Sequence, residues 1–234
     1  MSALKDTLVQ ATQIVPYVAG DNIGFGVALI RTASKTCKGS MADNAANLIG
    51  FSVQPQNGVT LDKDGFYQLV NNSDKPDIVR VARRGSVIRA LCITKADTSI
   101  VDGDFMEAAP LGDASCYIGV LNEAGGDAGE TKIAGACFQA WEDCVMLDES
   151  YQSPDAVNVA VGDSTITFVA ATMAKMALSV GDYIVLEDLN GDAQLNRVKA
   201  LTATVITLEL PSTVALTATT DYVRKCYQIL GQII

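Results

Sequence analysis

Two apolar runs with a polar break between them lie between positions 77 and 93, and the rest of the chain is interpreted around this stretch. Apolar positions cluster within residues 79–82 and 87–91, on either side of the polar segment 83–86 (RRGS). A polar segment with a glycine is typical of a point where a strand ends or bulges. The pattern therefore predicts paired β-structure over residues 77–93, at the centre of a larger β-domain.

The residues before this stretch predict an arm followed by further strands. Residues 1–24 have weak periodicity, and Pro16 stops their one short amphipathic segment. We expect an extended arm here that a neighbouring subunit holds in place. Beyond it, β-type alternation interrupted by turn residues predicts strands within residues 24–34, 48–58 and 66–70.

A weaker copy of the same order of elements follows the central stretch. Residues 118–121 (IGVL) resemble residues 49–52 (IGFS), and residues 131–141 take the place that residues 84–93 hold after the first copy. The match is short. It leaves open both an internal duplication and a chance similarity between two β-patterns.

The polar segment 144–155 contains Pro154 and is typical of a boundary between domains. The predicted organisation is therefore an arm at residues 1–24, a β-domain at residues 25–147 and a second β-domain at residues 148–234.

Alternation is cleaner in the second domain. Strands are predicted within residues 157–168 and 180–211, with a hairpin turn at residues 190–191 (NG), and six short strands in about 80 residues are typical of a small barrel. Residues 171–179 have helical propensity, but an isolated helix of this length is marginal, so a loop or a single turn is predicted. The apolar residues 229–234 either close this barrel or dock into a neighbour.

Composition and charge exclude several function classes. The 234 residues include 17 basic and 27 acidic side chains and no histidine. A net charge of −10 argues against affinity for nucleic acid or for anionic membranes. The absence of histidine removes the commonest general base and metal ligand. No apolar window of about eighteen residues and no secretory signal are recognisable, so neither a membrane span nor export is expected.

The cysteines are scattered and form no CxxC pair. Two of them, Cys92 and Cys137, lie within apolar runs. This distribution predicts buried free thiols in a protein made in a reducing compartment. The full set is Cys37, Cys92, Cys116, Cys137, Cys144 and Cys226.

The candidate chemical motifs fail on spacing. Residues 188–192 resemble half of a calcium loop but lack its acidic first ligand and its final glutamate. Residues 125–132 lack the order of a phosphate loop and lead into a strand. The acidic pairs at 142–143 and 187–188 are adjacent, so on a strand their side chains point to opposite faces. No catalytic, cofactor-binding or metal-binding residue is predicted, and an enzyme is not expected.

One basic cluster occurs in this acidic chain, formed by Arg80, Arg83, Arg84 and Arg89. It allows two interpretations: a contact to an acidic surface of a partner subunit, or a solvated turn with ion pairs that contribute little to stability.

Several short segments together resemble the capsid decoration (cement) proteins of tailed viruses. They are residues 48–52 (LIGFS), 79–85 (VRVARRG) and 101–104 (VDGD), followed by a closing apolar strand at residues 132–138. The resemblance covers about residues 26–141. It implies a β-tulip or small barrel, and a protein that lies on the outside of an icosahedral shell, often as a trimer, without doing chemistry.

The fold class predicted is all-β: a β-tulip or barrel-like N-terminal domain with an extended N-terminal arm, plus a small C-terminal β-barrel. The predicted function is that of a virion structural protein, made in the host cytoplasm, which decorates the capsid surface. Its expected partners are the major capsid protein and copies of itself, because decoration relies on weak contacts repeated by symmetry.

Two alternatives remain. One is a tail or head-tail connector component. The other is a ligand-binding or glycan-binding adhesion module, which predicts exposed aromatic residues grouped on one face, whereas Tyr183, Tyr222 and Tyr227 are dispersed along the sequence of the second domain.

Overall fold

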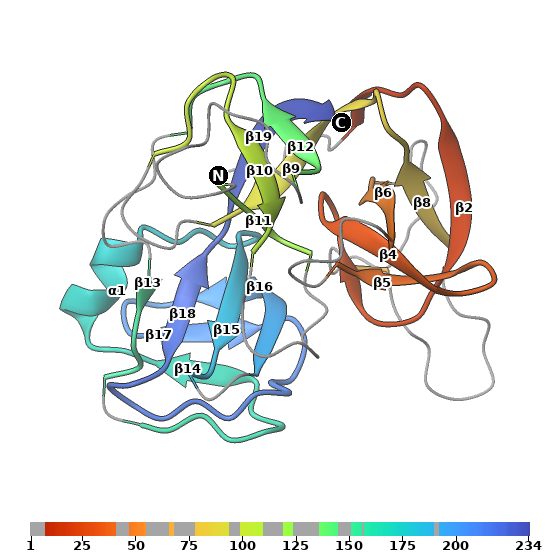
Figure 1. Ribbon diagram of the computed structural model, residues 1–234. Coiled ribbons are helices and arrows are strands. Elements are labelled where there is room, and N and C mark those ends of the chain that lie inside the picture. Colours follow the sequence, from red (N-terminus) through yellow and green to blue (C-terminus); the bar gives the residue numbers. More distant parts are fainter. Residues whose placement is uncertain are drawn as a thin grey trace. The chain divides into compact units, whose positions relative to one another are not determined.

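The computed structural model shows a chain that is nearly all β, with one described helix (Figure 1). The all-β, barrel-like prediction is confirmed. Among the described residues, an N-terminal unit comprises those up to Cys144 together with 228–234, and a C-terminal unit comprises those from 151 to 227. The described residues are 8–40, 47–54, 66–67, 78–93, 99–109, 119–123, 136–144, 151–155, 157–189 and 192–234.

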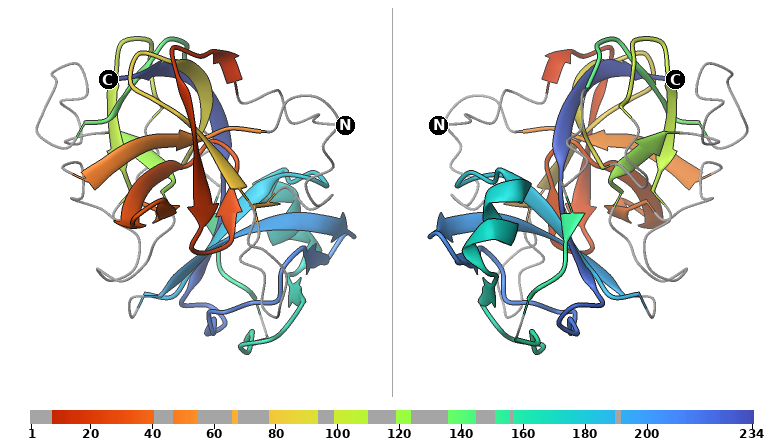
Figure 2. Two further views of the ribbon diagram at one scale, coloured as in Figure 1. Left: turned by 90° about the vertical axis from the view of Figure 1, so that its right-hand side faces the viewer. Right: turned by 90° about the vertical axis from the view of Figure 1, so that its left-hand side faces the viewer.

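A closed barrel of five strands forms one part of the N-terminal unit. Its strands, coloured red to yellow in Figures 1 and 2, wrap round until the last meets the first. In order around the barrel they are β2 (Ile14–Ala19), β5 (Thr36–Gly39), β4 (Ala28–Ala33), β6 (Leu48–Ser52) and β8 (Ile78–Ala82).

The prediction of an arm over residues 1–24 is wrong where the structure describes it, because β2 is a barrel strand. Pro16 lies in β2 opposite Arg80. Arg80 makes its backbone hydrogen bonds elsewhere: its carbonyl accepts the Val53 amide at 2.9 Å, and its amide donates to the Tyr67 hydroxyl at 3.3 Å. The missing amide hydrogen of Pro16 therefore costs this position no ladder hydrogen bond.

A six-stranded sheet forms the other part of this unit, in the order β1-β9-β11-β10-β12-β19, and an additional pairing joins β9 to β19. Five of the six strands thus form a ring of pairings, with β1 attached to β9. A short two-stranded sheet, β3 (Ile23–Gly24) with β7 (Phe66–Tyr67), completes the unit. The six strands are β1 (Leu8–Gln10), β9 (Val87–Cys92), β10 (Phe105–Ala108), β11 (Leu121–Glu123), β12 (Phe138–Ala140) and β19 (Tyr227–Ile233).

The central stretch forms two strands with a break between them, as predicted, but the strands do not pair with each other. β8 belongs to the barrel and β9 to the six-stranded sheet. Residues 83–86 carry the chain between them. Gly85 adopts a positive φ of 84°, and its amide donates to the Ile233 carbonyl at 2.7 Å. The break is therefore the crossing point between the two parts of the unit.

The possible duplication receives no support from the described strands. Leu48–Ser52 forms barrel strand β6, whereas the similar segment leads into β11 of the six-stranded sheet. The two segments do share a close backbone approach at a glycine. An added Cβ would lie 2.0 Å from the Ala82 oxygen at Gly50 and 2.2 Å from the Ala28 oxygen at Gly119.

The C-terminal unit is built on an open six-stranded sheet in the order β13-β18-β15-β16-β17-β14. The predicted small barrel is therefore not closed. β14 to β18 fall within the predicted strands, whereas β13 lies in the segment predicted as a domain boundary. The hairpin predicted around residues 190–191 joins β15 to β16, although these two residues lie outside the described part. The strands are β13 (Tyr151–Gln152), β14 (Thr165–Thr167), β15 (Tyr183–Glu187), β16 (Ala193–Leu201), β17 (Val205–Leu208) and β18 (Tyr222–Lys225).

The last strand departs from the domain boundaries predicted at 148–234. Rather than closing the C-terminal sheet, β19 pairs with β12 and β9 of the N-terminal unit. Phe138, for example, is the partner of Ile233. Periodicity identifies β19 as a strand but carries no information about which sheet it joins.

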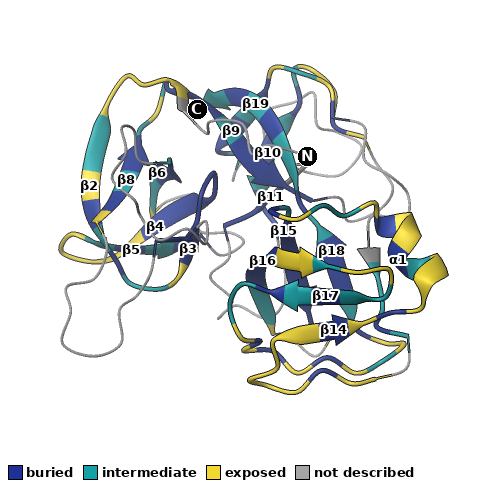
Figure 3. Ribbon diagram, turned by 180° about the vertical axis from the view of Figure 1, so that it is seen from behind, coloured by how far each residue is buried: buried dark blue, intermediate teal, exposed yellow. Residues whose placement is uncertain are grey.

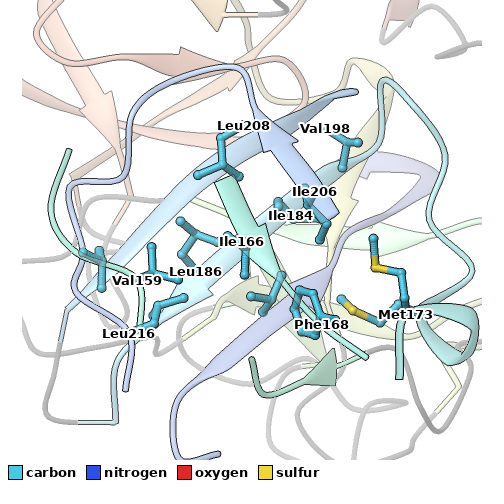
Figure 4. Packing of buried hydrophobic residues seen from close by; sticks show 13 residues of the cluster. Val159, Ile166, Phe168, Met173, Ile184, Leu186, Val198, Ile206, Leu208 and Leu216 are labelled. Atoms are coloured by element: carbon cyan, nitrogen blue, oxygen red, sulfur yellow. The ribbon is translucent and has the colours of Figure 1, made fainter. Parts of the chain in front are cut away.

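The C-terminal unit has a continuous apolar core (Figure 4). Ile166, the middle residue of β14, points into it, as does Phe168. The fully or largely buried members are Val159, Ile166, Phe168, Met173, Met176, Ile184, Leu186, Val198, Ile206, Leu208, Val214, Leu216 and Val223.

Helix α1 (Ala170–Met176) corrects the prediction of a loop or a single turn at residues 171–179. Met173 and Met176, three residues apart, bury one face of the helix in this core. Asp155 supports its start by accepting the Val169 amide and the Thr172 hydroxyl. Tertiary packing thus supplies the stability that such a short helix lacks in isolation.

Candidate functional site

Two of the four arginines of the basic cluster make contacts inside the N-terminal unit. Arg83 donates from Nη1 to the Ile49 carbonyl at 2.7 Å and from Nη2 to the Tyr17 hydroxyl at 3.3 Å. Its guanidinium also lies 5.8 Å from the centre of the Tyr17 ring. These contacts connect three barrel segments, so Arg83 has a structural role.

Arg89 is likewise engaged within the unit. Its Nη1 lies 2.8 Å from Oε1 of Glu142, and the same oxygen accepts the Leu230 amide at 2.9 Å. Arg84 has an exposed side chain, and Arg80 is half-buried. Arg83 and Arg89 are therefore engaged inside the unit, and contact with a partner subunit stays a prediction for Arg84 and Arg80.

A shallow pocket of about 320 Å³ with a mixed polar and apolar lining lies in the C-terminal unit. Thr219, at its rim, adopts a positive φ of 66°, which is rare for a β-branched residue, and its amide donates to the Pro154 carbonyl at 2.8 Å. The Arg224 guanidinium lies 5.1 Å from the centre of the Tyr222 ring and so fixes that wall. The lining residues are Gln152, Ser153, Pro154, Asp155, Thr219 and Tyr222.

This pocket combines an aromatic wall with hydroxyl, amide and carboxylate groups. Both oxygens of Asp155 already accept hydrogen bonds from the start of α1, so this carboxylate has a structural role. Sequence reasoning missed the site because its residues come from segments nearly seventy positions apart.

The edge strand β14 is the second exposed feature of this unit. Thr165 and Thr167 have exposed side chains on either side of the buried Ile166 (Figure 3). Val161 and Val169, which flank the strand in sequence, are 66% and 51% exposed. Apart from Asp163, the exposed residues of segment 161–169 are uncharged, and four of them are β-branched.

The described cysteines are buried free thiols, as predicted, and Cys116 lies outside the described part. Burial raises the pKa of Cys37 and of Cys137 to about 12, and it also raises the pKa of Cys226. Cys144 differs: a hydrogen bond with the Cys92 side chain lowers its pKa, against the opposing effects of burial and of Glu142. These two thiols, 52 positions apart, are therefore in contact.

The motifs rejected on spacing have structural roles where they are described. The Asp188 amide donates to the Asp192 carbonyl at 2.8 Å, as in a hairpin. Glu187 forms a buried ion pair with Arg224. Residues 125–132 lie outside the described part.

Metal and membrane features are absent from the described part of the chain. No cluster of three or more side chains there is arranged to hold a metal ion. Nor does any described helix have the length and apolar character needed to span a bilayer.

Comparison with known proteins identified no similar protein. The chain matches no protein-family model, and no curated protein is significantly similar to it.

Proposed function

We propose that the protein is a virion structural protein, a capsid decoration (cement) protein that stabilises an icosahedral shell from outside. It acts through contacts with the major capsid protein and with copies of itself, arranged as a trimer. The observation that carries the proposal is the way β9 ties the N-terminal unit together. β1 pairs with β9, with Leu8 opposite Ile88, and Ile233 of β19 hydrogen-bonds to Gly85 and Ser86 at its start.

This arrangement suits a protein that resists tension. The first and last described strands both pair with β9, beside a barrel with no free edge. Both strands are thereby attached to the same central strand. A rigid body of this kind transmits load between neighbouring capsomers, and symmetry multiplies weak contacts into strong overall attachment.

The proposal is tested by adding the purified chain to empty shells that lack it and sedimenting the mixture. We expect saturable co-sedimentation with a fixed number of copies per shell and a higher temperature of shell rupture. Arg84→Glu is expected to weaken binding if the exposed arginine faces an acidic capsid surface, whereas Lys35→Glu, at an exposed turn of the barrel, serves as the charge-matched control. Absence of binding to shells at low and moderate salt would refute the proposal.

The same particles distinguish the tail or connector alternative. A decoration protein covers the shell at all symmetry-equivalent positions, whereas a connector component occupies one vertex. Electron microscopy of the reconstituted particles separates the two patterns.

A second candidate function is glycan binding, and the pocket around Tyr222 favours it. An aromatic ring held by Arg224 and surrounded by polar groups is compatible with a sugar ring. Screening the chain on a glycan array tests this function. A hit that Gln152→Ala abolishes, while Gln194→Ala on β16 preserves it, would support the pocket; an array without hits would remove this candidate.

A further inference from the structure

Strand β14 ends the C-terminal sheet with backbone groups directed away from it. The Leu208 amide donates to the Ser164 carbonyl at 2.9 Å, and the Phe168 amide donates to the Thr204 carbonyl at 2.8 Å. In an antiparallel ladder, alternate residues bond to the same neighbour. Ser164, Ile166 and Phe168 therefore face β17, and the amide and carbonyl groups of Thr165 and Thr167 face outward.

No other described strand pairs with β14 on this outer side. The side chains of Thr165 and Thr167 are exposed, which agrees with an uncovered edge. Figure 3 shows β14 coloured mainly as exposed, beside the more buried β17. Among the described residues, two outward amides and two outward carbonyls of β14 therefore have no strand partner.

The edge has only one of the features by which proteins prevent edge pairing, which is its short length of three residues. The others are a lysine, a proline, a bulge or an inward-pointing charge. Residues 164–171 (STITFVAA) contain no charged residue and no proline, and three of them are β-branched residues of high strand propensity in β14 itself. The edge can therefore accept a short partner strand, and its length limits the strength of that pairing.

The chemistry of the edge selects a second copy of the same chain as that partner. Each chain carries a net charge of −10, so two copies repel except where their surfaces are free of charge. This segment is such a surface. It is also self-complementary, because a two-fold axis through Ile166 places Thr165 of one copy opposite Thr167 of the other.

We propose that β14 of two copies pair antiparallel about Ile166, which joins their C-terminal sheets into one continuous sheet. Thr165 and Thr167 form hydrogen-bonded pairs across the axis, with roughly four new backbone hydrogen bonds in all. Their side chains lie next to each other on the outer face, where Thr–Thr pairs are favourable. The contact links neighbouring copies wherever their N-terminal units are anchored.

The pairing is weak in solution because each strand has three residues. We expect a dissociation constant on the order of 100 µM. Copies fixed side by side on a surface associate more strongly, because their effective concentration is higher. The solution experiment needs no shell, so its failure is distinct from failure of the proposed function.

Sedimentation velocity of the full chain, at concentrations up to about 1 mM, measures the association. Thr167→Pro removes an outward amide hydrogen that has no partner within the sheet, and Thr167→Lys adds a charge at the edge. Both are expected to give monomers with an unchanged melting temperature. Thr207→Lys is the matched control: Thr207 lies opposite Thr165 on the same face, but in the interior strand β17.

Amide hydrogen exchange locates the contact. In the associated native chain, the Thr165 and Thr167 amides are expected to exchange at least tenfold more slowly than in Thr167→Lys, with core amides of β15 unchanged. A native chain that stays monomeric over this range would overturn the proposal. So would association that Thr207→Lys abolishes as fully as Thr167→Lys, because the sheet face would then be the contact.

Discussion

The barrel of the N-terminal unit and the sheet of the C-terminal unit solve the same problem in opposite ways. Each must satisfy the backbone hydrogen bonds of several short strands. The barrel does so by closing, so none of its five strands is an edge, whereas the C-terminal sheet stops at β14 with outward groups unused. A closed barrel pairs the backbone amide and carbonyl groups of every strand, whereas an open sheet leaves those on the outer side of its edge strands for a partner.

Closure also imposes a steric cost that the open sheet avoids. At Gly50, φ is 136° and an added Cβ would lie 2.0 Å from the Ala82 oxygen in the neighbouring strand β8. In the C-terminal unit, Gly162 has φ of 97° with open space around it. The barrel is therefore expected to tolerate a substitution at Gly50 less well than the C-terminal unit tolerates one at Gly162.

The strongest test of this contrast is Gly50→Ala. The methyl group cannot fit without moving β6 away from β8, so we expect the free energy of unfolding of the N-terminal unit to fall by about 4 kcal/mol or more. The single tryptophan, Trp141, belongs to this unit, so its fluorescence during urea unfolding measures the loss. Gly103→Ala, with a positive φ of 100° but no atom near the new methyl, should cost only about 1 kcal/mol. Equal losses in both variants would show that closure is not the constraint.

The second test reverses the contrast by attacking the C-terminal unit. Glu187→Leu leaves the buried Arg224 guanidinium without its carboxylate, which is expected to destabilise this unit by about 3 kcal/mol. Hydrogen exchange of the β15 and β18 amides should accelerate, while Trp141 fluorescence reports unchanged unfolding of the other unit. The double variant Glu187→Leu with Arg224→Met should recover most of the loss. If the double variant does not recover stability, the two side chains also interact with other groups.

A third test concerns a polar link inside the N-terminal unit. The buried Ser52 hydroxyl donates to the Gly24 carbonyl at 2.7 Å and accepts the Val27 amide at 3.0 Å. Ser52→Ala leaves both buried backbone groups without this partner, so a loss of about 1–2 kcal/mol is expected in the Trp141 unfolding curve. Ser34→Ala, at an exposed turn of the barrel, should change it little. If Ser52→Ala lowers the free energy of unfolding no more than Ser34→Ala does, water replaces the hydroxyl.

Local patterns identified the strands well because alternation and turn residues are local properties. β8, β9, β15 and β16 all fall within predicted strands, and residues 83–86 form the predicted break. Pairing partners are not local. Nothing in the periodicity indicates that β2 belongs to the barrel, that the chain crosses between sheets at Gly85, or that β19 returns to the N-terminal unit.

The candidate sites were less predictable for the same reason. Asp155 was assigned to a linker, yet it supports α1 and lines the pocket with Tyr222. The outer edge of β14 can be identified only once its pairing with β17 on the other side is known. Cysteine spacing identified no pair, because Cys92 and Cys144 meet through the fold and not through a motif.

That thiol contact provides the smallest and most selective test, since it changes reactivity without changing the fold. The lowered pKa of Cys144 means that its thiolate is present at a lower pH than that of an ordinary thiol. Cys137, with a pKa of about 12, is ionised in only about one molecule in a thousand at pH 9. A short pulse of iodoacetamide between pH 7 and pH 9 should therefore modify Cys144 before Cys137, as measured by peptide mass spectrometry. Cys92→Ala removes the hydrogen bond, so it should raise the pKa of Cys144 and slow its modification several-fold, whereas Cys37→Ala should leave the rate unchanged. Equal rates at Cys144 and Cys137 would indicate that access through opening of the N-terminal unit, and not thiolate stabilisation, controls the reaction, because both thiols belong to that unit.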